Sequence, residues 1–488
     1  TDIDGKFTLD AVKVGETLQI KLMGMKTIEV VFRGEPLHIT LQEDAVMMDE
    51  IVVVAYGEQK RSSFTGSASV VSADAIARRP VSNVMSSLEG VTSGVQIQST
   101  SGAPDATPSF RIRGASSINA GRDPLIVVDG VPYESGWNNI NPNDVESVTV
   151  LKDAASTAIY GARGGNGVVL ITTKKAGKQE KISVTFDAKF AASTIRKSDL
   201  YDVISEPGEF YERHYQAMYN YYQNVAGYNS YRANEEANAS FAGNSDKGGL
   251  GYVVYTVPDG QQLIGYNGKL NPNATLGRLV TGTDGKTYML TPDDWVDETY
   301  KTGFRQEYNL SIKGGTDKLS LLATAGYTND SAITEASGYE RFTGRMKGMF
   351  NATKWLRVSA NLDAAVSTTN SNTDYDNNSN NIFSNANRVA PIYPVYIRDE
   401  HGNYVYDENG KVYDYGDGTY NNKIQRPINT GSNRLQEALI QTRRTKSTKV
   451  GAQAAADFMI TSDLTVTLNV AYDERDRRYK TTAQPFYG

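Results

Sequence analysis

The residue types that most often carry out chemistry in proteins are scarce in this sequence and far apart. The chain has 488 residues, no cysteine and three histidines, His38, His214 and His401. Without cysteine there is no thiolate zinc site, iron–sulfur cluster or disulfide scaffold. The histidines lie in three separate segments, and no serine is grouped with a histidine and an aspartate. We therefore expect no enzyme activity, no metal and no cofactor.

Two short motifs look like ligand loops but lack essential parts. The glycine-rich run from Gly161 to Gly167 precedes a predicted strand, whereas a dinucleotide loop follows a strand and opens a helix. The run from Asp374 to Asn378 begins like a calcium loop, yet it lacks the central glycine and the glutamate at position twelve. Neither motif predicts a binding site.

Charge and hydropathy restrict the partners. The 50 Lys and Arg residues against 56 Asp and Glu give a net charge of −6, without a long basic run, so no nucleic-acid partner is expected. The longest apolar runs, Ile51–Tyr56 and Pro124–Val128, are much shorter than the ~18 residues of a membrane helix. A membrane wall built from strands stays open, because only alternate residues of such strands face lipid.

The length suggests about three domains at ~100–200 residues each. In residues 1–48, short strands are predicted at Thr17–Lys21, Thr27–Phe32 and His38–Leu41. Three strands cannot bury two sheet faces, so we expect the end of a β-sandwich whose first part lies upstream.

Residues 49–57 combine an acidic pair with a β-branched run, from Asp49 to Gly57. One interpretation is a buried strand of the neighbouring sandwich. The other is an extended segment that adds to the sheet edge of a partner, where main-chain hydrogen bonds supply affinity. The sequence pattern leaves both open.

Residues 58–178 are predicted to form a mixed α/β domain with short strands and many glycines. It has too few long amphipathic helices for a nucleotide-binding domain. Its predicted strands are Ala68–Val71, Val95–Gln98, Leu125–Val128, Ser147–Leu151 and Gly167–Lys174.

From residue 179 to 488 the pattern changes to long strands with period-two alternation of apolar and polar residues. Seven such strands are predicted, each longer than the ~9–11 residues that cross a bilayer as a tilted strand. They are Lys181–Ser193, Phe304–Lys313, Lys318–Asn329, Glu340–Asn351, Trp355–Ser367, Ser447–Ile460 and Leu464–Arg475.

The connections favour a barrel wall over a soluble sandwich. Very short links at 314–317, 352–354 and 461–463 alternate with longer ones, which is typical of outer-membrane barrels. A barrel wide enough to hold a domain of this size needs about 22 strands. Seven strands are neither even in number nor enough to close, so we expect only the first strands of the barrel here.

The long loops, about 195–303 and 368–446, are rich in tyrosine and asparagine. Tyr211, Tyr215 and Tyr219 are spaced i, i+4, i+8 on a helix predicted to begin near Pro207. They form either a packing stripe or a platform for substrate, and both interpretations stay open. The asparagine-rich stretch 370–387 is predicted to be disordered or a polar loop, although asparagine and tyrosine side chains also suit sugar hydroxyls.

Taken together, these segments resemble the SusC/RagA-type TonB-dependent outer-membrane transporters. Residues 49–57 look like their TonB box, and residues 58–178 like their plug domain. The closest motif matches are Phe110–Gly114, Pro124–Pro132, Asn143–Ala154, Ala158–Gly164 and Asn166–Lys174. Residues 1–48 are similar to the carboxypeptidase-regulatory-like sandwich of this family, and the chain resembles a fragment truncated at both ends.

The resemblance implies a mainly β fold: a partial β-sandwich, an α/β plug domain and the first strands of a large antiparallel transmembrane β-barrel. It implies a structural role for plug motif residues, which are Arg111, Arg113, Gly114, Asp129, Gly130, Asp144, Glu146, Lys152, Asp153, Tyr160, Gly161, Arg163, Gly164 and Gly167. The charged residues among them are expected to pair with the barrel lumen. TonB is implied to contact Asp49, Glu50, Ile51, Val52, Val53, Val54, Ala55, Tyr56 and Gly57.

The implied function is active import of a large nutrient, an oligosaccharide or a peptide, across the outer membrane of a Gram-negative bacterium of the Bacteroidota type. The implied partners are TonB with ExbB and ExbD, and a SusD-like surface lipoprotein that acts as a lid. Alternatives are a siderophore or vitamin receptor and a signal-transducing receptor of the same fold. A secreted, non-enzymatic carbohydrate-binding β protein is the alternative from another class.

Overall fold

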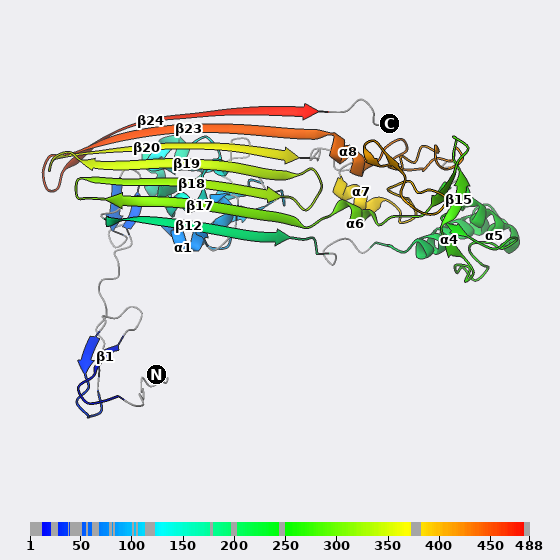
Figure 1. The fold of residues 1–488 in the computed structure, drawn as a ribbon, viewed down its shortest axis with the longest axis horizontal. Coiled ribbons are helices and arrows are strands. Elements are labelled where there is room, and N and C mark those ends of the chain that lie inside the picture. Colours follow the sequence, from blue (N-terminus) through cyan, green and yellow to red (C-terminus); the bar gives the residue numbers. More distant parts are fainter. Residues whose placement is uncertain are drawn as a thin grey trace.

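The computed structural model contains a long sheet, a small mixed domain against it, and a set of loops and helices at one end of the sheet (Figure 1). It describes residues 12–20, 28–37, 39, 51–54, 57–60, 68–77, 81, 83–99, 102–103, 106–112, 123–175, 179–196, 203–243, 249–371 and 382–482. None of the helices among these residues is long and apolar enough to cross a membrane.

The N-terminal segment forms two small hairpins. Strands β1 (Thr17–Ile20) and β2 (Ile28–Val31) lie where strands were predicted, and they pair antiparallel, whereas the third predicted strand lies almost wholly outside the described residues. Strands β3 (Ile51–Val54) and β4 (Gly57–Lys60) pair antiparallel with each other.

The plug region, residues 58–178, is built on a five-stranded mixed sheet in the order β5-β10-β11-β8-β9. Its strands are β5 (Ala68–Ser72), β8 (Leu125–Val128), β9 (Val131–Pro132), β10 (Val145–Leu151) and β11 (Val168–Thr173). A separate pair is formed by β6 (Val95–Gln98) and β7 (Ser109–Ile112). Short helices connect them: α1 (Ala73–Ala77), α2 (Val84–Ser87), η2 (Trp137–Asn139), η3 (Pro142–Asp144), α3 (Ala154–Thr157) and η4 (Ala158–Gly164).

The central strands of this sheet are buried on both faces. Val148 and Val150 of β10 pack with α1 and α2 in one apolar cluster, and Leu151 and Leu170 belong to a second one. Because β10 and β11 are hydrophobic on successive residues, they occupy the middle of the sheet rather than an edge.

The wall is a seven-stranded antiparallel sheet in which each strand pairs with the next along the chain, with β12 and β24 at its edges. All seven predicted strands are present. They are β12 (Gln179–Ser193), β17 (Gly303–Gly315), β18 (Leu319–Ser331), β19 (Gly338–Asn351), β20 (Leu356–Ser371), β23 (Thr442–Met459) and β24 (Thr465–Thr482).

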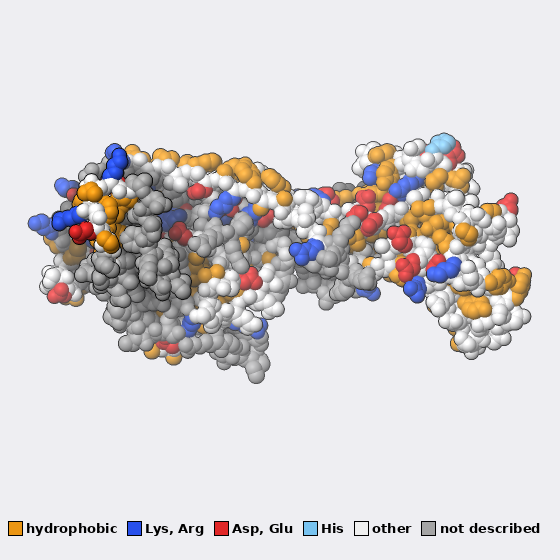
Figure 2. All heavy atoms as spheres, turned by 90° about the horizontal axis from the view of Figure 1, so that it is seen from below, with side chains coloured by type: hydrophobic (Ala, Val, Ile, Leu, Met, Phe, Trp, Pro, Cys, Tyr) orange, Lys and Arg blue, Asp and Glu red, His pale blue; other side chains and the backbone are white. Residues whose placement is uncertain are grey.

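The two faces of the wall differ in chemistry, because successive side chains of a strand point to opposite sides. On β19, the outward-facing Phe342, Met346 and Phe350 are 47–62% exposed, whereas Arg341 and Arg345, which face the plug region, are buried. Hydrophobic side chains line the upper edge of the left half of the molecule, where the wall is seen edge-on (Figure 2).

The loop module, residues 203–302 and 382–441, lies at the end of the wall away from the short turns (Figure 1). Its helices are α4 (Pro207–Asn224), α5 (Ser230–Ala239), η6 (Ser240–Ala242), α6 (Trp295–Thr299), α7 (Ile382–Arg388) and α8 (Arg434–Ile440). Its short strands are β13 (Tyr255–Thr256), β14 (Thr275–Leu276), β15 (Arg278–Thr281), β16 (Thr287–Leu290), β21 (Tyr406–Asp407) and β22 (Gly410–Lys411).

The two long loops interlock into one unit. The Tyr393 hydroxyl donates to the carbonyl of Leu250 at 2.9 Å, and the Tyr252 hydroxyl donates to the Asp414 carboxylate at 3.1 Å. The prediction of a polar loop is wrong for 382–388, which form α7. Ile382 and Ala386, spaced i and i+4, give this helix a buried face despite its asparagines.

We expect Gly167→Ala to destabilise the plug region. Gly167 has φ +91°, and a Cβ there would lie 2.5 Å from Ile112 Cδ1. The strain should cost about 1–3 kcal/mol and speed hydrogen–deuterium exchange in Val168–Thr173 of the whole protein. Gly102→Ala is the control, since a Cβ at Gly102 meets nothing within 4 Å. Equal exchange in the two variants would contradict the prediction.

Candidate functional site

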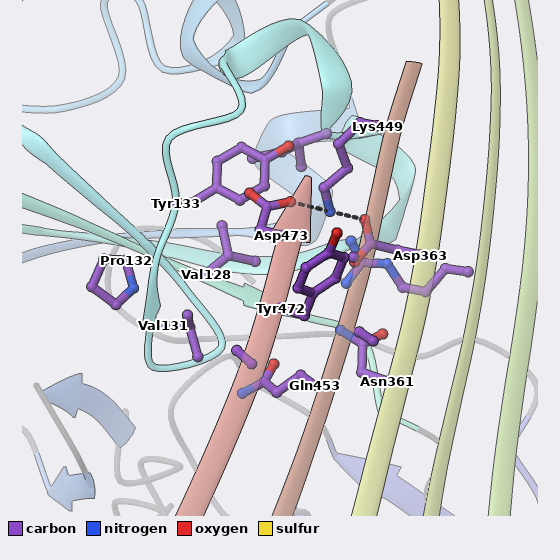
Figure 3. Close-up of a pocket in the computed structure, with 15 residues that line it drawn as sticks. Val128, Val131, Pro132, Tyr133, Asn361, Asp363, Lys449, Gln453, Tyr472 and Asp473 are labelled. Carbon is purple, nitrogen blue, oxygen red and sulfur yellow. Dashed lines mark hydrogen bonds and ion pairs between the residues drawn. The ribbon is translucent and has the colours of Figure 1, made fainter. Parts of the chain in front are cut away.

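The candidate site is the interface where the plug region meets the inward face of the wall. The β8–β9 hairpin and the segment 133–144 supply the plug side, and strands β17, β19, β20, β23 and β24 supply the wall side. Figure 3 shows part of it, with Tyr133 above Asp473 and Lys449 directed toward Asp363.

A two-residue hairpin turn presents the first plug carboxylate. Asp129 and Gly130 connect β8 to β9 with φ of 48° and 85°, the positive values that a type I′ turn requires. The Asp129 carboxylate accepts hydrogen bonds from Thr173 N at 2.9 Å, Thr173 Oγ1 at 2.5 Å and Lys347 Nζ of β19 at 3.0 Å. The turn therefore fixes the position of the Asp129 carboxylate. This position in turn determines where the Lys347 ammonium group of the wall must lie.

Asp129 stays ionised despite its burial. Burial alone would raise its pKa, but the Lys347 ammonium, the Thr173 hydroxyl and amide, and the Arg345 guanidinium outweigh that effect. The net result is a pKa below the usual value of Asp.

Asp144, at the end of η3, is the second plug carboxylate. Arg345 lies between the two carboxylates, with Nε 3.5 Å from Asp144 Oδ2 and Nη1 3.8 Å from Asp129 Oδ2. The side chains of Arg345 and Asp144 are only 6% and 7% exposed. One buried arginine of the wall thus bridges two separate segments of the plug region.

Amide side chains make the next contacts along β17 and β19. Asn141 Nδ2 donates to Asn309 Oδ1 at 2.8 Å and to Thr343 Oγ1 at 3.2 Å. Asn143 Nδ2 donates to Glu307 Oε1 at 2.6 Å. Asn141 also approaches Gly326 so closely that a Cβ there would lie 2.3 Å from its Nδ2.

Wall side chains also bind the plug backbone. Arg341, which is 1% exposed, donates from Nη1 to the carbonyl of Asn138 at 2.9 Å, and the Tyr339 hydroxyl donates to the same carbonyl at 3.2 Å. Gln453 Nε2 donates to the carbonyl of Asp129 at 3.0 Å. These bonds fix the path of the plug chain whatever its side chains are.

The third contact region lies at β20, β23 and β24. Ser135 Oγ donates to Asp473 Oδ2 at 2.6 Å, and Lys449 Nζ lies 3.3 Å from Asp473 Oδ1 and also pairs with Asp363. The Tyr133 ring lies 5.2 Å from Lys449 Nζ. A small cavity of about 40 Å³ beside these groups shows that the two surfaces are not fully packed (Figure 3).

These contacts form a mainly polar interface between the plug region and the wall, and we call this interface the joint. Most of them are hydrogen bonds and ion pairs whose groups water can solvate after separation, unlike an apolar core. The described residues contain no group of three or more His, Asp or Glu that could hold a metal ion. The contacts hold the plug region against the inward face of the wall mainly through polar groups.

Comparison with known proteins agrees with this arrangement. The model of the TonB-dependent receptor plug domain matches residues 60–168. The chain is 31% identical over 351 residues to TonB-dependent receptor SusC of Bacteroides thetaiotaomicron, covering 70% of this chain and 28% of the relative. It is 30% identical over 404 residues to TonB-dependent receptor P26 of Formosa agariphila, covering 82% of this chain and 34% of the relative.

A solved structure of the RagAB peptide importer in the open-open state superposes with a TM-score of 0.63. It is 25% identical in sequence, and the match covers 88% of this chain and 43% of that one. The chain belongs to the SusC/RagA-type TonB-dependent transporters. It spans about a third of the length of the curated relatives it matches, 28% and 34% of the two named above.

Among the plug motif residues of this SusC/RagA-type chain, Asp129, Gly130 and Asp144 lie at the joint. Others are structural within the plug region: Asp153 caps α3 through Ser156 N at 2.7 Å, and Lys152 binds Ser93 and Ser69.

The remaining motif residues that the structure describes make no contact with the wall named above. Arg163 pairs with Glu134 at the surface at 2.5 Å, Glu146 is exposed on β10, and Arg111 lies on β7. Gly161 and Gly167 have positive φ, Gly164 leaves no room for a Cβ beside Thr157 O, and Tyr160 packs partly buried against the second plug cluster. Arg113 and Gly114 lie outside the described residues.

The predicted TonB box is described only in part. Ile51–Val54 form β3, and Gly57 begins β4, while Asp49, Glu50, Ala55 and Tyr56 lie outside the described residues. Contact of this segment with TonB stays a prediction.

The three tyrosines considered for substrate contact lie on α4 of the loop module. Tyr211 and Tyr215 are buried, and their hydroxyls accept hydrogen bonds from Val254 N and Asn234 Nδ2. Tyr219 is partly exposed and stacks on Tyr215 with ring centroids 5.5 Å apart. A contact of this group with substrate stays a prediction.

Sequence reasoning did not single out the wall residues of the joint, chiefly Glu307, Arg345, Lys347, Lys449 and Asp473. A signal for them exists. They occupy the polar positions of the period-two pattern, on the face of the wall opposite the apolar side chains.

We expect Asp129→Asn to loosen the joint. The change leaves the largely buried Lys347 without its anionic partner, which should weaken docking of the plug region by about 3 kcal/mol. Hydrogen–deuterium exchange in Ile140–Leu151 of the whole protein measures the loss. Glu134→Gln is the control, because its exposed pair with Arg163 is worth less than about 1 kcal/mol. Unchanged protection in Asp129→Asn would contradict the role of this ion pair.

We also expect a defined pH dependence. The pKa of Asp129 is lowered in the folded protein, so its stabilising effect is complete above the ordinary Asp pKa of about 3.9 and is lost as pH falls through the lowered value. The difference in protection of Ile140–Leu151 between wild type and Asp129→Asn should therefore stay constant between about pH 5 and 8. Below about pH 4 the wild type should approach the exchange of Asp129→Asn. If the protection of wild type relative to Asp129→Asn grew as the pH fell, the lowered pKa of Asp129 would be refuted.

Proposed function

We propose that the chain is part of a TonB-dependent transporter that imports a large nutrient across the outer membrane. The observation that carries the proposal is a single sheet with two opposite faces. Its inward face holds the plug region through ion pairs and hydrogen bonds, and its outward face carries exposed apolar side chains.

The outward face supports placement in a bilayer. On β19 the apolar band runs from Phe342 to Phe350, which is about 27 Å along the strand. Aromatic rings line its loop-side border in a row, with Tyr308 stacked on Tyr327 and Tyr327 packed on Phe342. Trp355 stacks on Phe458 at the border near the short turns. Two aromatic girdles around an apolar band are typical of outer-membrane walls.

The register also supports a tilted membrane wall. Starting from Phe190, the last large outward-facing apolar residue of β12, the row of paired residues across the sheet reaches Arg478 on β24. On β24 itself, the last large outward-facing apolar residue is Tyr472, which lies six residues before Arg478 in the sequence. The end of the apolar band therefore shifts by about 20 Å along the strands while the sheet extends about 29 Å from β12 to β24. These two lengths correspond to a strand tilt of about 35°. Transmembrane barrels tilt their strands by roughly 35–45°.

This band weighs against the secreted carbohydrate-binding alternative. A soluble sheet would cover its apolar face with a second layer, whereas here the plug region lies against the polar face. The exposed residues Val184, Phe186, Leu321, Leu362 and Leu468 belong to one continuous surface on the outward side. Such a surface is stable when lipid covers it.

The proposed energy source is the inner-membrane proton gradient, delivered through TonB with ExbB and ExbD. TonB would pair with the segment 49–57 by strand addition, for which the β-branched strand Ile51–Val54 is suited. A pull on this segment would act on the plug region, which begins directly after it.

The proposed cargo is an oligosaccharide or a peptide, captured under a SusD-like lipoprotein. Similarity to SusC and to the RagAB peptide importer supports this class of cargo. The chain is also 26% identical over 362 residues to the ferric enterobactin receptor of Pseudomonas aeruginosa. This identity is lower than that to SusC, so it supports the siderophore alternative less strongly. Siderophore receptors do not normally carry a sandwich like that proposed for residues 1–48.

We expect deletion of residues 49–57 from the full-length protein to abolish binding of the C-terminal domain of TonB and energised uptake of a labelled oligosaccharide or peptide mixture. Surface binding of the same mixture should persist, because the loops are untouched. The control is Lys354→Gln, which changes an exposed residue of a short turn of the wall and leaves the loops unchanged. Normal uptake after removal of 49–57 would exclude this segment as the TonB contact.

A further inference from the structure

One plug side chain occupies the space that a side chain at Gly326 of the wall would fill. We call this space the socket, and its walls are Asn309 of β17, Gly326 of β18 and Thr343 of β19, which are direct cross-strand neighbours. Asn141 of the plug region lies in the socket, where its Nδ2 donates to Asn309 Oδ1 at 2.8 Å and to Thr343 Oγ1 at 3.2 Å. Asn141 and Asn309 are both buried, so the contact is closed to water.

Glycine is the only residue type at position 326 that leaves room for Asn141. A Cβ there would lie 2.3 Å from Asn141 Nδ2, 2.7 Å from Thr343 Oγ1 and 2.9 Å from Asn309 Oδ1. All three distances are shorter than real Cβ contacts. The three atoms are joined by hydrogen bonds, so none can move aside without breaking one. Any other side chain at position 326 would therefore displace Asn141 from the wall.

The levels of β18 on either side of the socket are filled. Side chains of one face recur at every second residue, so Thr324 and Thr328 are the neighbours of Gly326 on the inward face. Both are β-branched and occupy the space that Gly326 leaves open. Movement of the plug region by one such step, about 7 Å along the strand, would drive Asn141 against a threonine.

The charged contacts of this plug segment fix its level less strictly than the socket does. Arg341 binds the carbonyl of Asn138, and Arg345 lies beside the Asp144 carboxylate. Both arginines project from the same face of β19, and a guanidinium carries five donors on a long side chain, so it can reach oxygens at more than one level. Steric fit at Gly326 therefore selects one level among those that the charges allow.

Asn141 also connects the socket to the buried ion pair. Its Oδ1 accepts a hydrogen bond from Asn143 N at 3.0 Å and so caps η3. This short helix ends at Asp144, whose carboxylate lies 3.5 Å from Arg345 Nε. The two ends of one amide thus have different partners, the oxygen within the plug region and the nitrogen in the wall. Displacement of Asn141 would shift the cap and with it the carboxylate.

We propose that Gly326 is a positioning residue for the closed state of the transporter. The socket receives Asn141 and sets the one level at which the plug region seals the channel. The inference rests on the proposed function, because a seal is needed only where the wall belongs to a channel. Release of the plug region must withdraw Asn141 from the socket, and its return restores the seal.

The experiment measures passive efflux of trapped calcein from phosphatidylcholine vesicles that contain the full-length protein and no TonB. The test variant, Gly326→Ala, places a methyl group in the socket. The matched control is Gly344→Ala, the same change on the neighbouring strand β19, where a Cβ meets nothing within 4 Å. Asn141→Ser is combined with each wall, because serine keeps an oxygen that can cap η3 but does not reach the socket.

Wild type and Gly344→Ala should retain calcein, and Gly326→Ala should release it about tenfold faster. Asn141→Ser should raise efflux in the native wall, because two hydrogen bonds to the wall are lost. In the Gly326→Ala wall the same change should lower efflux, because it removes the clash. A general loss of wall stability would not reverse the sign in this way. Equal efflux from wild type and Gly326→Ala, or no rescue by Asn141→Ser, would overturn the proposal.

A second variant tests the socket with the wall unchanged. Asn141→Gln lengthens the plug side chain by one methylene group and so creates the clash from the plug side. It should release calcein as fast as Gly326→Ala does, which keeps the test decisive even where Gly326→Ala prevents assembly of the wall. A tight seal in Asn141→Gln would overturn the proposal.

Energised uptake in cells separates this proposal from the proposed function. If only the socket is wrong, wild type imports the labelled oligosaccharide or peptide mixture while Gly326→Ala and Asn141→Gln stay sealed in vesicles. If the function is wrong, wild type itself imports nothing.

Discussion

Two buried carboxylates of the plug region, Asp129 and Asp144, meet two buried cations of one wall strand, Lys347 and Arg345. Charges taken out of water must find partners in good geometry, because an unpaired buried charge is strongly destabilising. Both cations lie on the same face of β19, two residues apart. A slip of β19 by one residue would turn both toward the outward face, so this contact constrains the register of the whole wall.

Because successive residues of a strand point to opposite faces, the two faces of one sheet can have different chemistry. Outward positions supply the apolar band, and inward positions supply the charges, amides and hydroxyls of the joint. The plug region is stabilised mainly by its own apolar cores around β10 and β11. Its attachment to the wall relies on polar contacts, so the plug region can leave the wall without exposing a large apolar surface. The stability of the plug region therefore depends on contacts other than those that attach it to the wall.

Sequence reasoning predicted the elements better than their contacts. The alternation in residues such as Val358, Ala360 and Leu362 was sufficient to place the wall strands and their two faces. It could not pair Asp129 with Lys347, because they are more than 200 residues apart and many inward charges were available as partners. The loop module was hidden for a similar reason: its core joins Tyr252 to Asp414 across two loops. Helix α7 was missed because its asparagine content outweighed its three buried positions, one of which is itself an asparagine, Asn385.

If the chain is part of the proposed transporter, the joint that holds the plug region on the wall must open during transport. A disulfide between Ser135→Cys and Asp473→Cys in the full-length protein tests this directly, and residues 1–488 contain no other cysteine. These side chains contact each other across the joint, with Ser135 Oγ 2.6 Å from Asp473 Oδ2. The measurement is energised uptake of a labelled oligosaccharide or peptide mixture before and after reduction. The account predicts that the oxidised protein binds this mixture but does not import it, and that reduction restores import. Full import with the cross-link in place would contradict the account.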